Sequence, residues 1–268
     1  MRQGEPMDGG AQHGIQRWRI TRPVDRSPSC ELGDDAMMAL AGEMTTPSAA
    51  IDLLKEGRNS IVEMHEVASR RWVVKRAARS GVAERVTSAI RLSPLWREWR
   101  GARRLRRAGV RCCQPIARVR GRDVRGREML IMPFVEGPTL HRFIREVNEP
   151  AERRVVAEAT GRQLHRLLHV GLVNRDHKTS NLIIDEACRR GGEQPMLIDP
   201  AGLRRATPDR VARMFARLLE TAVKAGPISK REMLTVLRAA FPGRPVEERR
   251  RARRSIAAAY RRMNGPPL

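Results

Sequence analysis

Aromatic side chains are scarce in this sequence, which has a single tyrosine, Tyr260, and only 3% Phe, Trp and Tyr together. Proteins that bind single-stranded nucleic acid stack the bases on aromatic rings, and they need several such rings. The composition therefore argues against nucleic acid as the main partner, even though other features of the chain attract anions.

Acidic residues are outnumbered, with 30 Asp and Glu against 53 Lys and Arg, which leaves a formal net charge of +23 and a pI near 11.5. A surplus of this size favours anionic partners such as nucleic acid, an acidic membrane surface or a phosphorylated substrate. Nearly all of the basic residues are arginines. The only lysines are Lys55, Lys75, Lys178, Lys224 and Lys230.

Long apolar runs and paired cysteine motifs are also missing. The N-terminal segment has several arginines but no apolar stretch of the kind found in a secretory signal. The longest notable apolar run, Met129 to Val135, is far shorter than a membrane span. The cysteines show no C-x-x-C spacing, which favours reduced thiols. We expect a soluble protein in the cytoplasm, with peripheral contact at the inner membrane as an alternative.

Changes of composition divide the chain into three parts. Residues 1–46 are rich in Gly, Pro, Asp and Ser without periodicity, which predicts a mostly disordered tail. Residues 47–136 predict a helix at 94–108 and short strands at 51–55, 61–68, 71–77, 115–120 and 128–134. Residues 137–268 predict short strands at 182–184 and 196–198 and helices over 140–147, 156–168, 208–225, 229–240 and 246–263. This order predicts an α+β fold, with a β-rich part followed by an α-rich part.

The most specific motif is the D-x-x-x-x-N spacing of Asp176 and Asn181, which precedes a short apolar run. In protein kinases this spacing forms the catalytic loop, where the carboxylate orients the acceptor hydroxyl and the amide oxygen binds magnesium. Lys178 can reach the transferred phosphoryl group as a compact charge. A surface Asp-Asn loop is the ordinary alternative. The apolar run that ends in Asp199 favours the catalytic interpretation, because the second metal-binding aspartate of kinases occupies that place.

Upstream, Lys75 ends the apolar run Trp72-Val-Val-Lys, which resembles the strand that carries the phosphate-binding lysine of kinases. Glu98 lies on the next predicted helix, where an ion pair would hold this lysine against the nucleotide phosphates. An exposed lysine is usually only a solvated charge. In a chain that otherwise prefers arginine, however, lysine at this position favours a functional role, since a planar guanidinium does not replace a compact ammonium.

Two further segments complete a nucleotide site. Gly57, Arg58, Asn59 and Ser60 lie between two predicted strands, where their backbone N–H groups can cover phosphates, although protein kinases have three glycines there. The run from Met132 to Val135 corresponds to the hinge, where backbone groups of Val135 would meet the adenine.

Together these motifs resemble the lipopolysaccharide kinase (Kdo/WaaP) family of the protein-kinase-like superfamily. The resemblance extends from about Ile51 to Arg262 and includes Arg97-Glu98-Trp99 followed by Leu105 and Ala108-Gly-Val110. It implies a bilobal fold, with residues 47–136 as the N-lobe and 137–268 as a reduced C-lobe. It also implies ATP and Mg²⁺ as cofactors, and transfer to a sugar hydroxyl of an anionic glycan or glycolipid.

The resemblance assigns a role to each polar residue of the motifs. Asp176 is the catalytic base, assisted by Lys178, while Lys75 holds the phosphates and Glu98 is its partner. Asn181 and Asp199 are the metal ligands.

The sequence departs from the family pattern at three places. Asn174 replaces the usual His before Arg175, Pro200-Ala201 replaces Phe-Gly after Asp199, and the glycine loop is reduced. The first two changes suggest the loss of a regulatory contact. A protein or small-molecule kinase of the same fold and a non-catalytic scaffold for acidic partners are the alternatives. The sequence does not identify the acceptor or the oligomeric state.

An arginine cluster at residues 249–254 lies on the last predicted helix. Such a cluster is usually a solvated helix face. Docking of this helix to acidic headgroups is the alternative interpretation.

Overall fold

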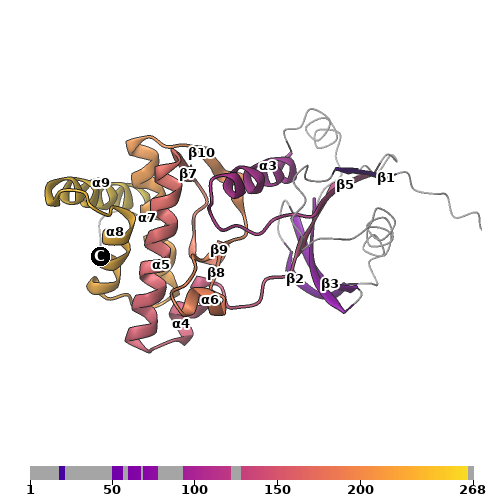
Figure 1. The fold of residues 1–268 in the computed structure, drawn as a ribbon, viewed down its shortest axis with the longest axis horizontal. Helices are drawn as coiled ribbons and strands as arrows, with labels where there is room; N and C mark the ends of the chain where they lie inside the picture. Colours follow the sequence, from indigo (N-terminus) through magenta and orange to yellow (C-terminus); the bar gives the residue numbers. More distant parts are fainter. Residues whose placement is uncertain are drawn as a thin grey trace, which may run out of the picture.

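The computed structural model describes residues 18–21, 50–56, 60–67, 69–77, 93–121 and 128–264. These residues form two lobes that lie side by side, a sheet at one end of the molecule and a helical body at the other (Figure 1). The α+β fold class predicted from the sequence is confirmed.

The first lobe is built on a six-stranded antiparallel sheet in the order β1-β5-β6-β4-β3-β2. The strands are Trp18–Thr21 (β1), Ala50–Glu56 (β2), Ser60–Val67 (β3), Arg70–Ala77 (β4), Ala117–Gly121 (β5) and Glu128–Pro133 (β6). Strand β4 alternates buried and half-buried residues from Trp72 onward, which is the period-2 pattern of a strand with one covered face. Ser69 turns the chain between β3 and β4 with a φ of 58°.

Strand β1 corrects part of the sequence-based expectation for residues 1–46. Its four residues pair antiparallel with β5, in a register that joins Trp18 to Gly121 and Thr21 to Arg118. The rest of the predicted tail lies outside the described residues. The strand was missed because it is short and because β5, its partner among the described residues, is about a hundred residues away in the chain.

Helix α3, Pro94–Arg107, joins the two lobes. Neighbouring residues determine where this helix begins: the Ser93 hydroxyl accepts a hydrogen bond from the Trp96 N–H, and Pro94 occupies the first turn. Gly109, with a φ of 65°, ends it. One face of the helix is buried, and it consists of Leu95, Glu98, Trp99, Gly101, Ala102 and Leu105.

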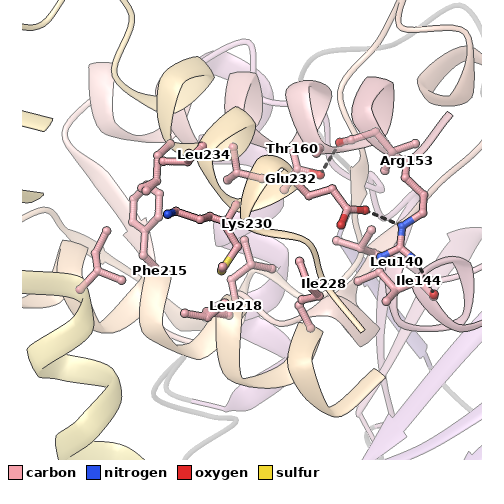
Figure 2. Close-up of a pocket in the computed structure, with 18 of the residues that line it drawn as sticks. Leu140, Ile144, Arg153, Thr160, Phe215, Leu218, Ile228, Lys230, Glu232 and Leu234 are labelled. Carbon is pink, nitrogen blue, oxygen red and sulfur yellow. Dashed lines mark hydrogen bonds and ion pairs between the residues drawn. The ribbon is translucent and has the colours of Figure 1, made fainter. Parts of the chain in front are cut away.

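The second lobe is a helical body with a continuous apolar core. Its long helices are α5 (Pro150–His169), α7 (Pro208–Ala225), α8 (Lys230–Ala240) and α9 (Val246–Asn264), and its shorter helices are α4 (Leu140–Glu146) and α6 (Glu186–Arg189). In this body, residues of α4, α5, α7, α8 and α9 line a partly open apolar cavity of about 460 Å³ (Figure 2). In the described part of the chain, no helix is long and apolar enough to cross a membrane.

Short strands and turns between α5 and α7 face the first lobe. Leu172–Asn174 (β7) pairs with Leu203–Arg205 (β10), and Leu182–Ile183 (β8) pairs with Met196–Leu197 (β9). Two single helical turns, Thr179–Asn181 (η2) and Pro200–Gly202 (η3), follow β7 and β9 respectively. These paired strands hold two polar loops next to each other, although more than twenty residues separate the loops in sequence.

The close packing of α3 against η3 at the junction of the lobes can be tested by a substitution. A Cβ added at Gly101 would clash with the backbone carbonyl of Pro200, which cannot rotate away as a side chain can. We expect Gly101→Ala to lower the free energy of unfolding by about 1–3 kcal/mol, the usual cost of overpacking. Urea denaturation measures this. Gly192→Ala is the control, because its Cβ would meet only ordinary contacts; equal effects from both variants would contradict the close packing.

Candidate active site

The ion pair expected between Lys75 and Glu98 is present. Lys75 lies on β4 and Glu98 on the buried face of α3, and the Lys75 Nζ is 2.6 Å from Glu98 Oε2. Glu98 is only 1% exposed. A carboxylate so deeply buried needs a charged or hydrogen-bonding partner, and the lysine supplies both.

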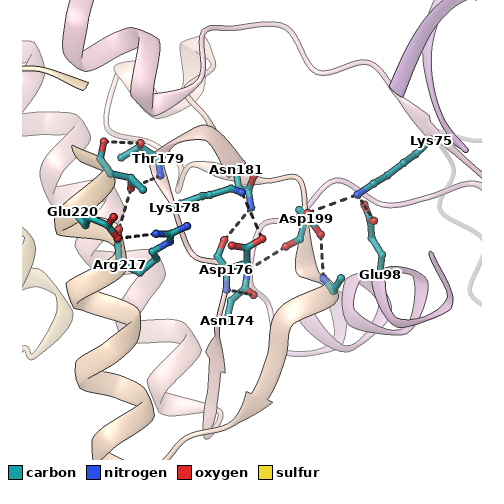
Figure 3. A network of polar contacts seen from close by, with 12 residues as sticks. Lys75, Glu98, Asn174, Asp176, Lys178, Thr179, Asn181, Asp199, Arg217 and Glu220 are labelled. Carbon is teal, nitrogen blue, oxygen red and sulfur yellow. Dashed lines mark hydrogen bonds and ion pairs between the residues drawn. The ribbon is translucent and has the colours of Figure 1, made fainter. Parts of the chain in front are cut away.

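Asp199 completes a three-way contact around the same ammonium. Its Oδ2 lies 3.7 Å from the Lys75 Nζ, while its Oδ1 accepts a hydrogen bond of 3.4 Å from the Ala201 N–H. Asp199 lies two residues after the end of β9 and caps η3. The lysine therefore joins three elements, β4, α3 and the β9–η3 turn (Figure 3).

The charges of this cluster shift the pKa values of its members. Burial is the largest influence on Lys75 and lowers its pKa, but the Glu98 and Asp199 carboxylates together outweigh it, so the pKa of Lys75 lies above its ordinary value. Burial is also the main cause that raises the pKa of Glu98 to about 7; the charge of Asp199 adds to this, and Lys75 opposes it. Lys75 therefore stays charged at neutral pH, while Glu98 is close to protonation.

The loop between β7 and η2 carries Asp176, whose side chain is 40% exposed. Its carboxylate Oδ2 is 3.6 Å from the Lys178 Nζ. Its backbone carbonyl accepts a hydrogen bond of 2.9 Å from the Asn181 side-chain nitrogen. The carboxylate is thus open to an incoming group, whereas the backbone beneath it is held in place.

Asn181 is oriented by that bond. Because its side-chain nitrogen donates to a carbonyl, its amide oxygen is the free end, and no described residue donates to it. The Asn181 backbone carbonyl accepts a hydrogen bond from the Ile198 N–H at 3.0 Å, which holds Asn181 next to the segment that leads from β9 to Asp199. This arrangement leaves one amide oxygen and one carboxylate available to a cation. Magnesium suits such a pair, since it commonly takes one or two protein carboxylates together with phosphates and water.

Asn174 is a site residue whose role the sequence did not reveal. It is fully buried, its Oδ1 accepts from the Asp176 N–H at 3.2 Å, and its Nδ2 donates to the Asp199 carbonyl at 3.2 Å. Gly202 lies against it so closely that a Cβ there would be 2.5 Å from the Asn174 Oδ1. The residue that replaces the usual His therefore links the two loops directly.

A second group missed from the sequence lies on α7. The Thr221 hydroxyl accepts from the Thr179 N–H at 3.0 Å, which ties α7 to the catalytic loop. One turn earlier, Arg217 donates to Glu220 at 2.7 Å, and Lys224 donates to the same carboxylate at 2.6 Å. Figure 3 shows the Arg217 side chain on the same side of the site as Lys178. The i,i+3 and i,i+4 spacing of Arg217, Glu220 and Lys224 indicates one face of a helix. No local pattern in the sequence indicates that this face lies next to the catalytic loop.

His177 lies between Asp176 and Lys178 in the sequence, but its side chain is buried in the protein. Full burial lowers its pKa to about 4, and neither ring nitrogen has a partner among the described residues. It is therefore neutral at pH 7.

The remaining predicted nucleotide contacts are described only in part. Gly57, Arg58 and Asn59 lie outside the described residues, and Ser60 begins β3. Met132 is buried near the end of β6, and Val135 is half-buried against the same apolar cluster, together with Met196 and Ile198 from the β9 side. Apolar side chains from both lobes thus meet beside the polar cluster.

Comparisons with known proteins found a matching family model and a similar solved structure. Residues 54–175 match the model of the phosphotransferase enzyme family (APH), a segment that contains Lys75 and Glu98 and ends one residue before Asp176. The solved structure of WaaP in complex with acyl carrier protein matches with a TM-score of 0.61 and 21% identity, over 91% of this chain and 97% of that chain. The chain has a protein-kinase-like fold. No curated protein matched the sequence. The comparisons support a kinase, as the sequence motifs indicated.

A neutral replacement of the lysine tests the coupling of the three charges. In Lys75→Met we expect the pKa of Glu98 to rise further above 7, because the only group that lowers it is gone. A carboxyl whose folded pKa exceeds its ordinary value stabilises the fold at low pH and loses that contribution as pH rises through the folded pKa. The free energy of unfolding of the variant should therefore fall by up to about 1.4 kcal/mol per pH unit above pH 7, as measured by urea titrations.

The control is Lys75→Met combined with Glu98→Gln, which removes the titrating group and should abolish the extra slope. If the extra slope persisted in the double variant, its origin would lie elsewhere than Glu98.

Proposed function

We propose that this chain is an ATP- and Mg²⁺-dependent phosphotransferase that acts on a hydroxyl group. The observation that carries this proposal is the ammonium of Lys75, held between Glu98 and Asp199 and facing the loop of Asp176 and Asn181. Lys75 would bind the nucleotide phosphates, and Asn181 with Asp199 would hold the metal ion, which offsets charge on the transferred group. Asp176 would orient and deprotonate the acceptor hydroxyl.

The buried polar groups argue against the alternative of a non-catalytic scaffold. A scaffold gains nothing from a nearly buried carboxylate, whose desolvation costs stability. Here Glu98 and its lysine are kept at the junction of the lobes, and the free oxygen of Asn181 stands beside Asp199. Buried ionisable groups with shifted pKa values, such as Glu98, are typical of functional sites.

For the acceptor we favour a sugar hydroxyl of a lipopolysaccharide-type glycolipid. The fold similarity to WaaP and the net charge of +23 support this class, because anionic groups on the acceptor would be steered to a basic protein. Lys178 and Arg217, near the open side of Asp176, offer charged donors for such groups. A protein or small-molecule kinase of the same fold is the alternative acceptor class.

The proposed roles predict different effects of three substitutions. Asp199→Asn and Asn181→Ala should weaken Mg²⁺-dependent nucleotide binding, because each removes a metal ligand. Asp176→Ala should leave nucleotide binding largely intact and lower transfer by about 10²–10⁴-fold, the usual share of a general base. Nucleotide titrations with and without Mg²⁺, paired with turnover assays, measure both effects. Equal effects of all three substitutions on binding would contradict the assignment.

The acceptor class is tested by offering labelled ATP with lipopolysaccharide, a neutral peptide or an aminoglycoside. We expect label in lipopolysaccharide, and we expect added salt to lower this transfer more than ATP hydrolysis, because screening acts over about 8 Å at physiological ionic strength. Efficient, salt-independent labelling of the peptide alone would replace the glycolipid with a protein acceptor.

The cavity of the helical lobe supports a second proposal, about a partner. WaaP was solved in complex with acyl carrier protein, and in this chain the cavity is lined almost entirely by apolar side chains, with Phe143, Phe215 and Leu218 among them. Two exposed cations, Lys230 and Arg253, also belong to its lining. We infer that the cavity accepts the acyl chain of an acylated partner and that the cations meet the polar end of the chain.

Filling the cavity tests this inference. Ala157 lines the cavity on α5, whereas the next residue, Glu158, is exposed. We expect Ala157→Phe to lower the affinity for acylated acyl carrier protein at least about tenfold, and Glu158→Phe to leave it unchanged, as measured by calorimetry. Carrier protein without the acyl chain should bind weakly to every variant. Equal affinity for both forms of the carrier protein would contradict the inference.

A further inference from the structure

Helix α3 has two faces of opposite character. Its buried face positions Glu98 against Lys75 and packs Gly101 against the turn that follows Asp199. Its other face is a row of exposed arginines, at i, i+3, i+7 and i+10, called here the α3 arginine stripe: Arg97, Arg100, Arg104 and Arg107. At 1.5 Å per residue, the row is roughly 15 Å long.

The α3 arginine stripe has no acidic counterpart among the described residues. The helix has one acidic residue, Glu98, and that residue faces inward. Neighbours on the stripe are therefore like charges at i,i+3 and i,i+4 spacing, which destabilises a helix.

Elsewhere the same chain pairs some of its helical arginines. Four other helices each hold an arginine against an acid one turn away, Arg142–Glu146, Arg162–Glu158, Arg213–Asp209 and Arg250–Glu247, and Arg190, which follows α6, pairs with Glu186. The last helix also has exposed arginines without an ion pair among the described residues, namely Arg251, Arg254 and Arg261. Pairing is therefore available to helices of this chain, and the α3 arginine stripe lacks it among the described residues. A row of like charges kept at a cost to the helix indicates an external anionic partner.

The shape and composition of the stripe fit a flat, repeating anion. Guanidinium groups bind phosphates through paired N–H donors, and a straight helix face presents them in one line without a groove. The aromatic ring nearest to the stripe, Trp96, is covered by the guanidinium of Arg118, whose carbon lies 4.7 Å from the ring centroid. That ring is thus not open to a nucleic-acid base, which would need an exposed platform.

We propose that the α3 arginine stripe docks the protein on an anionic phospholipid bilayer. This rests on the proposed function in one respect, namely that a lipid-linked acceptor requires the enzyme to work at a membrane. The docking helix is then the one that carries Glu98, so the surface that meets the lipid headgroups is directly coupled to the phosphate-binding lysine. We place the docking surface on α3 because this helix carries Glu98, and the arginine cluster of the last helix is the alternative that the sequence suggested.

The test compares two quadruple variants with the same change of charge. In the first, Arg97, Arg100, Arg104 and Arg107 are replaced by Gln; in the control, the exposed Arg238, Arg251, Arg254 and Arg261 of the helical lobe are replaced by Gln. Binding is measured by co-sedimentation with vesicles of phosphatidylcholine, with or without phosphatidylglycerol. Each arginine near an anionic membrane contributes roughly fivefold, so the loss of four arginines in the first variant should weaken binding by roughly several hundredfold, and the control far less.

Thermal unfolding shows whether the first variant folds. Its melting temperature should be unchanged or higher, because like-charge contacts within α3 are removed. Equal loss of vesicle binding in both variants would show a mere net-charge effect and would overturn the proposal. So would equal binding of the first variant and the wild type, or binding to soluble polyphosphate without binding to vesicles.

Vesicle binding requires neither acceptor nor turnover, so it separates this inference from the proposed function. A wild-type chain that binds vesicles through α3 but transfers no phosphate to lipopolysaccharide would contradict the acceptor and support the docking surface.

Discussion

The contact on which the candidate site depends is the Lys75 ammonium shared by Glu98 and Asp199. It joins a strand of the sheet, the helix between the lobes and the turn after β9. Burial alone would favour the neutral form of the lysine and of the carboxylates, so each of these groups depends on the others to remain charged. The spacing of the two lobes and the charges of the site therefore depend on the same contact.

Departures from the usual kinase motifs are compensated by close packing. Asn174, at a position where a His would be usual, forms hydrogen bonds to both loops. Gly202 has no side chain and therefore leaves space for the side chain of Asn174. In the same way, Gly101 leaves space for the backbone carbonyl of Pro200. The two loops of the site are thus connected through the hydrogen bonds of Asn174 to the backbone of both loops.

The surplus of arginine is distributed unevenly. In the helical lobe many arginines are bound to acids one turn away, where exposed pairs contribute only tenths of a kcal/mol each and mainly keep the surface soluble. The four arginines of the α3 arginine stripe have no ion pair among the described residues. Net charge alone, known from composition, could not tell these two uses apart, because the difference depends on which face of each helix is buried.

The sequence by itself determined the features that depend on neighbours in the chain. The helix over Pro208–Ala225 was predicted with its observed bounds, and the cap at Ser93 and the D-x-x-x-x-N spacing of the catalytic loop were evident, because caps, periodicity and loop spacing act within a few residues. Tertiary structure alone decided the pairing of β1 with β5, the bridging role of Asn174 and the apolar cavity. Each of these is made by segments far apart in sequence, whose contact no local pattern encodes.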